Sequence, residues 1–223
     1  MNLVPIGLLG LGFLSGIRHA FDIDHIAAVS TMLSKKLSFG KSSLLGIFWG
    51  IGHAISLFCA GLIVLLLKIA IPIKLALFFE FIVAAMIIVL GINVLLTISR
   101  EKIHVHRHKH GKVEHFHLHS HKSASHHAHW HTPLKKSLAV GLIHGLAGSA
   151  ALTLLILAGI PSAMLGLIYI LLFGIGSMLG MMLVSAIISL PFRLIPNKLY
   201  NAQKLLRLSA GLISIAIGLV III

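Results

Sequence analysis

Long apolar runs constrain this chain more than any other feature of its sequence. A helix of ~20 apolar residues suffices to cross a bilayer. Runs of that length lie at residues 3–33, 43–67, 75–99, 135–159, 163–190 and 202–223. Only 10% of the residues are charged, against about 25% in a typical soluble domain, and mean hydropathy is +1.05. We therefore predict an all-α polytopic membrane protein of about six transmembrane helices.

The distribution of basic residues predicts an orientation. The chain has 18 Lys+Arg against 5 Asp+Glu, in short clusters between the apolar runs, which favours cytoplasmic loops over nucleic-acid binding. Fifteen of the 18 follow the first, third and fifth runs, whereas the loops of the other side hold only Lys68 and Lys74. We expect a cell-membrane protein with both termini outside. Residues 1–17 lack a basic n-region, so we expect no cleavable signal peptide.

The third loop, residues 100–134, has a different composition from the rest of the chain. Its low apolar content and histidine bias predict disorder without metal. Imidazoles at alternate positions would bind divalent transition metals loosely and release them below pH ~6.5; a solvated spacer is the alternative. The twelve histidines are His104, His106, His108, His110, His115, His117, His119, His121, His126, His127, His129 and His131.

This loop separates two similar segments, residues 1–99 and 135–223. Gly-Ile-Arg-His-Ala at 16–20 parallels Gly-Leu-Ile-His-Gly at 141–145, and Gly-Ile-Gly-His at 50–53 parallels Gly-Ile-Gly-Ser at 174–177. The spacing is 34 residues from Gly16 to Gly50 and 33 from Gly141 to Gly174. Three spans per half is an odd number, so the halves would be inverted repeats, as in many transporters, with the substrate site between them.

Most of the charge inside the apolar runs lies in the first one. Charged groups are costly in a bilayer and mark functional sites by default. On a continuous helix His19, Asp22 and His25 lie within about 120° of one another, a polar stripe that can converge on one cation. The run is longer than a bilayer requires, so we expect it to be bent, tilted or broken.

Two further charges accompany this stripe. Asp24 projects to the other side, where it would orient a ligand histidine, or reach the ion if the helix unwinds. Arg18 lies one turn before Asp22, which predicts a resting ion pair that metal entry would break. The alternative is a salt-bridged cluster that only fixes helix packing, but such a cluster would not need two histidines on the stripe.

Two single histidines lie on otherwise apolar runs. His53 and His144 have glycine and alanine neighbours that allow close helix approach, and the repeat sets His144 opposite His19. We predict a metal or permeation role for both, against the alternative of hydrogen-bonded core histidines. Further candidates for lining the path are Ser149, Ser177 and Asn93.

The residue types of these candidate ligands restrict which metal ions can bind. Imidazole with carboxylate suits Ni²⁺, Co²⁺ or Zn²⁺. The only cysteine, Cys59, lies inside an apolar run, which disfavours a thiolate cluster and Cu⁺. Mg²⁺ and Ca²⁺ prefer all-oxygen shells. The choice among Ni²⁺, Co²⁺ and Zn²⁺ stays open at this point.

These motifs resemble a known family. Residues 18–28, Arg-His-Ala-Phe-Asp-Ile-Asp-His-Ile-Ala-Ala, resemble the His-x4-Asp-His signature helix of the nickel/cobalt transporters, and Gly52-His53-Ala54 resembles their glycine–histidine motif. Residues 141–150 and 173–181 are similar to the urease accessory protein H-like branch.

The resemblance implies high-affinity Ni²⁺ or Co²⁺ uptake, with essential positions at His19, Asp22, Asp24, His25 and His53. It also implies cytoplasmic partners that receive the metal, namely metallochaperones or urease or hydrogenase maturation proteins. Longer family members carry acidic residues in the second-half motifs, where this chain has none.

We therefore predict a transporter that is not an enzyme and has no catalytic cofactor. Efflux is the rival within transport. From other classes, a non-transporting metal sensor or accessory protein and an intramembrane metalloenzyme remain alternatives. The sequence has no His-Glu-x-x-His motif, which would have supported the metalloenzyme.

Overall fold

A computed structural model describes residues 3–34, 36–67, 71–100, 104–110, 113–119, 131–146, 160, 162–196 and 198–223. Two groups of predicted site residues fall outside these ranges: Ser149, and the loop residues His121, His126, His127 and His129.

The described chain is helical apart from one hairpin. Its helices are α1 (Leu3–His19), α2 (Ile23–Met32), α3 (Phe39–Leu67), α4 (Ile73–Arg100), α5 (His131–His144), α7 (Ala163–Leu194) and α8 (Tyr200–Ile222). Four of them, α3, α4, α7 and α8, are long and apolar enough to cross a membrane. These helices define a polytopic membrane protein.

The first predicted span, residues 3–33, is broken rather than continuous. Helix α1 ends at His19, and α2 begins after Asp22, whose φ of −62° and ψ of 149° are those of an extended N-cap residue. The amide N–H of Asp22 donates to the His19 carbonyl at 3.0 Å. Aspartate is a preferred N-cap residue, so the local sequence favours a helix start here. The fourth predicted span also differs, because α5 ends at His144.

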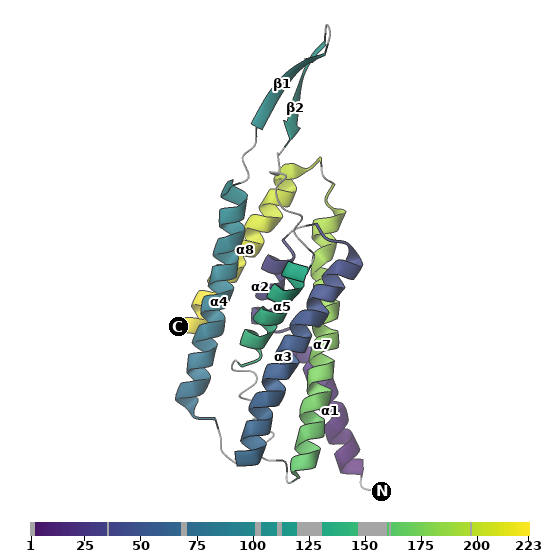
Figure 1. Cartoon of the computed structure of the whole chain (residues 1–223), viewed down its shortest axis with the longest axis vertical. Helices are drawn as coiled ribbons and strands as arrows, with labels where there is room; N and C mark the ends of the chain where they lie inside the picture. The colour runs from purple at the N-terminus through teal and green to yellow at the C-terminus, as the bar shows by residue number, and fades with distance from the viewer. Residues whose placement is uncertain are drawn as a thin grey trace.

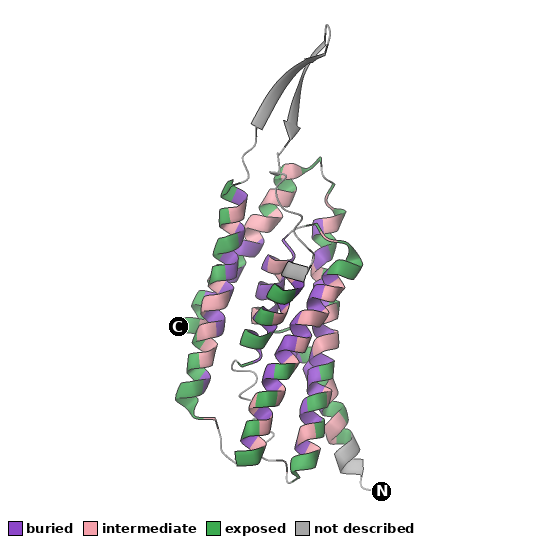
Figure 2. Cartoon of the chain, in the orientation of Figure 1, coloured by how far each residue is buried: buried purple, intermediate pink, exposed green. Residues whose placement is uncertain are grey.

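The helices pack as an elongated bundle (Figure 1). Helix α3 contacts α7 and α5, α7 also contacts α1, and α4 pairs with α8. The two short helices, α2 and α5, lie between these pairs (Figure 1). Figure 2 shows buried residues on inward faces and exposed ones on outward faces. Large apolar side chains such as Leu66, Phe78 and Val220 are exposed there, as expected for a surface that lipid covers.

Glycines allow the closest helix approaches, as expected where helices pack without a hydrophobic driving force. A Cβ on Gly91 would meet the Gly211 carbonyl oxygen at 2.7 Å, and a Cβ on Gly218 would meet that of Ala84 at 2.9 Å. The same close approach therefore occurs twice between α4 and α8.

A second set of glycine contacts links the remaining helices. A Cβ on Gly16 of α1 would meet the Phe173 carbonyl of α7, and one on Gly141 of α5 would meet the Trp49 carbonyl of α3. Likewise Gly176 lies against α1, and Gly52 against α5. Helix α1 thus packs on α7 through contacts that match those of α5 on α3.

A hairpin extends from one end of the bundle (Figure 1). Strands β1 (His104–His110) and β2 (Val113–His119) pair antiparallel, with His104 opposite His119 and His110 opposite Val113. Composition predicted disorder for this segment. The two strands follow the alternation of histidine with other residues, because a period of two matches a strand; disorder of residues 100–134 without metal stays a prediction.

Candidate metal centre

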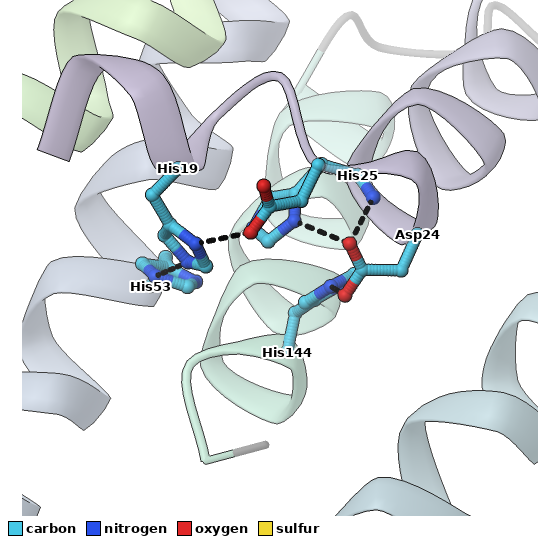
Figure 3. A network of polar contacts seen from close by, with 6 residues as sticks. His19, Asp24, His25, His53 and His144 are labelled. Atoms are coloured by element: carbon cyan, nitrogen blue, oxygen red, sulfur yellow. Dashed lines mark hydrogen bonds and ion pairs between the residues drawn. The ribbon is translucent and has the colours of Figure 1, made fainter. Parts of the chain in front are cut away.

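Four histidines from four helices meet at the middle of the bundle (Figure 3). His19 is the last residue of α1, His25 lies in the first turn of α2, His53 lies halfway along α3, and His144 ends α5. Their exposed fractions are 7%, 0%, 1% and 1%. Buried imidazoles contributed by separate helices converge here.

The first three of these histidines form one candidate ligand group. A nitrogen from each of His19, His25 and His53 lies within 4.8 Å of the others. The Nε2 atoms of His19 and His53 are 3.2 Å apart. An ion held at ~2.0–2.1 Å from each nitrogen keeps neighbouring ligand atoms about 2.9–3.4 Å apart. The spacing between these two nitrogens therefore fits a shared ion.

Asp22 connects the helix break to this group. Its Oδ2 lies 2.8 Å from His19 Nδ1, and its side chain makes no capping hydrogen bond to α2. A carboxylate on one ring nitrogen fixes the imidazole orientation and leaves the other nitrogen for metal. The contact keeps His19 and Asp22 together, as the predicted stripe requires, although the helix is broken between them.

Asp24 lies between two histidines. Its Oδ1 lies 3.0 Å from His25 Nδ1 and accepts the His25 backbone N–H at 2.9 Å, while its Oδ2 lies 2.9 Å from His144 Nε2 (Figure 3). Asp24, His25 and His144 form a second group with potential ligand atoms within 4.8 Å of one another. This contact is consistent with the orienting role, the first of the two roles expected for Asp24.

The other predicted site residues, Arg18, Ser177 and Asn93, differ in their burial and in what they contact. Arg18 is exposed, and Asp22 contacts His19 rather than forming the expected pair with Arg18 in the described part of the chain. Ser177 is fully buried, four residues beyond Phe173 on α7. Asn93 lies away from the histidines and lines a cavity of about 280 Å³ together with Thr31 and Lys136.

The electrostatics of the centre favour a cation. Both α1 and α5 end on a histidine at the centre, and a helix C-terminus carries about −0.5 of an elementary charge. Within the described chain, His25 Nε2, His53 Nδ1, His144 Nδ1 and Ser177 Oγ are buried without a hydrogen-bond partner. Unpaired buried acceptors are rare and costly, and an ion held between His19, His25 and His53 would pair with His25 Nε2.

Sequence reasoning missed two aromatic neighbours of this centre. The Trp49 ring lies 5.3 Å from His25 and 5.7 Å from His144, and the Phe173 ring lies 5.4 Å from His19, between centroids. Each precedes one of the matching glycine motifs, Gly50-Ile51-Gly52 and Gly174-Ile175-Gly176. Extending the repeat by one residue would have identified both.

The helices and the centre together define a membrane protein with a buried cluster of imidazoles and carboxylates suited to a divalent transition metal. Residues 5–223 match the family described as high-affinity nickel-transport protein, NicO. The chain belongs to this family of nickel transporters, and the resemblance noted in its sequence is confirmed. The metal ion is thus a transported substrate. Membership of a transporter family also implies that the protein is not an enzyme.

The chain is also similar to a urease accessory protein. The chain is 36% identical over 214 residues to the urease accessory protein UreH of Bacillus sp. (strain TB-90), covering 96% of this chain and 90% of that protein. No solved structure matches the chain.

Proposed function

We propose that the protein takes up Ni²⁺ into the cytoplasm, with Co²⁺ as a second substrate, through the histidine–aspartate centre. One observation carries this proposal: four buried imidazoles and two carboxylates from four helices meet midway along the bundle. In this proposal His19, His25 and His53 hold the ion, Asp22 orients His19, and Asp24 orients His25.

The architecture that we propose is six membrane crossings in two inverted halves. Helices α1 and α2 would make the first crossing together, and residues 135–159, of which 147–159 lie outside the described residues, the fourth. The matching glycine contacts of α1 on α7 and α5 on α3, and those repeated within the α4–α8 pair, support it. Both termini would then face outward, and the hairpin would face the cytoplasm, where the bias of basic residues places it.

The membrane potential would drive this uptake. A +2 ion gains about 4.6 kcal/mol per 100 mV on moving inward. The histidine-rich segment on the inner side would bind arriving ions loosely and pass them to metallochaperones or urease maturation proteins. The name of the UreH relative, a urease accessory protein, supports this connection with urease assembly.

The test is accumulation of ⁶³Ni²⁺ in cells expressing the wild type, His25→Ala, or a variant with the twelve loop histidines replaced by glutamine. Uptake through the centre predicts accumulation that His25→Ala abolishes and the loop variant only reduces. Vesicles containing the purified protein alone provide the matched measurement, because they distinguish a transporter from a component that needs partners.

The alternatives predict different results. Net loss of nickel relative to empty cells would mean efflux, with the same centre working in the other direction. Nickel binding without flux in the vesicles would favour an accessory role, which the name of the UreH relative also allows. Accumulation unaffected by His25→Ala would refute the proposed site.

A further inference from the structure

The second ligand group, Asp24, His25 and His144, has a role in the proposed function that orientation alone does not explain. His144 comes from the second half of the chain, and its side chain is 1% exposed. Its ring lies 4.1 Å from that of His25 between centroids, tilted by 44°, the shortest ring separation among the four histidines. Its Nδ1 has no partner in the described chain.

We propose that the ion occupies two alternative positions, and that the second is formed by Asp24, His25 and His144. This inference rests on the proposed function and adds an intermediate stop to it. The Asp24 Oδ2 and His144 Nε2 atoms are 2.9 Å apart, a separation that fits two ligands of one ion as well as a hydrogen bond. Carboxylate with two imidazoles is a ligand set that Ni²⁺, Co²⁺ and Zn²⁺ accept.

His25 belongs to both groups. Its Nδ1 faces Asp24 in the second group, whereas its Nε2 has no hydrogen-bond partner in the described chain. A neutral imidazole has one free lone pair, so His25 serves one position at a time. The two positions are therefore exclusive, and the ion passes between them while it stays bound to the protein.

The aromatic neighbours give the two positions a direction. Trp49 contacts His25 and His144, and it precedes His53 on α3, which begins at the hairpin end of the bundle (Figure 1). Phe173 contacts His19 and packs with Leu57 and Tyr169 toward the opposite end. The second position is thus the one nearer the hairpin, and the ion reaches it on the way to that end.

Nickel binding to purified full-length protein tests this inference. The parent carries glutamine at the twelve loop histidines, which removes background binding, and three variants are compared with it. They are His144→Ala, the pair His19→Ala/His53→Ala, and the triple variant that combines all three changes. ⁶³Ni²⁺ equilibrium dialysis gives the affinity, and thermal unfolding checks that each variant is folded.

Two alternative positions predict that His19→Ala/His53→Ala still binds nickel, with a lower affinity than the parent, and that the triple variant binds none. The inference is wrong if the pair binds no more nickel than the triple variant. A parent that binds no nickel would overturn the proposed function as well, so the two failures are distinguishable. Should the pair fail to fold, His19→Gln/His53→Gln replaces it, because glutamine keeps side-chain volume and polarity.

Discussion

The two halves of the molecule share their packing and differ in their chemistry. Helix α1 meets α7 as α5 meets α3, through glycines against main-chain carbonyls. Yet all five acidic residues of the chain precede residue 115, and the second half contributes His144 and Ser177 where the first has His19 and His53. A duplicated scaffold can therefore hold an asymmetric site, because helix packing needs only small residues at fixed positions.

The largest expected effect tests the shared packing. In Gly16→Val and Gly141→Val, the new Cβ would fall on the carbonyl of Phe173 or Trp49. Overpacking costs typically ~1–3 kcal/mol, and a main-chain atom cannot turn aside. We expect both variants to lose folded, monodisperse protein in detergent, measured by size-exclusion chromatography and thermal unfolding.

Gly10→Val is the matched control, because a Cβ on Gly10 has no atom within 4 Å. If Gly16→Val unfolds the protein and Gly141→Val does not, the two halves do not share their packing.

The next effect tests the chemical difference. His53→Ala should lower ⁶³Ni²⁺ accumulation to the background of empty cells, because it removes a buried nitrogen 3.2 Å from that of His19. Protein abundance measured on the same cells separates a lost ligand from lost expression. Accumulation above a tenth of the wild-type level would remove His53 from the ligand set.

Asp24→Asn should have a smaller effect. The amide keeps the shape of the side chain but loses the charge that faces His25 and His144. Replacing a group that orients metal ligands weakens metal binding about 10- to 100-fold, so we expect a loss of that size in competition with a nickel chelator. An unchanged affinity would show that Asp24 does not orient the ligands.

Ser177→Ala should have the smallest effect, although Ser177 matches His53 in the repeat. Its buried hydroxyl has no partner in the described chain, and an unsatisfied buried hydroxyl costs about 1–3 kcal/mol. We expect transport within about twofold of wild type and a thermal midpoint that is equal or higher. A loss comparable to that of His53→Ala would make Ser177 part of the site.

Much of this centre could be predicted from the chain. The clustering of His19, Asp22, Asp24 and His25 in one apolar run marked the place, since charge in a bilayer is costly. Glycines beside His53 and His144 indicated close packing on a neighbouring helix. The excess length of the first run predicted a bent, tilted or broken helix, and the structure breaks it after His19.

The remaining features depend on tertiary placement. On a continuous helix, Asp24 would point away from His19. Nothing in the local sequence shows that α5 brings His144 to Oδ2 of Asp24. The expected Arg18–Asp22 pair does not occur within the described chain, where the Asp22 carboxylate contacts His19 instead. The hairpin reflects the alternation of histidine with other residues, a period of two that composition alone does not register.

The unpaired polar atoms of the centre also bear on the lifetime of the protein. His25 Nε2 loses its hydration on folding and gains no partner within the described chain. An ion that pairs with this atom binds only the folded form, so a concentration of 100 times its Kd adds about 2.7 kcal/mol to stability. Nickel would then stabilise the folded form of the protein that transports it. In cells starved of the metal, the protein would have a shorter lifetime in the membrane.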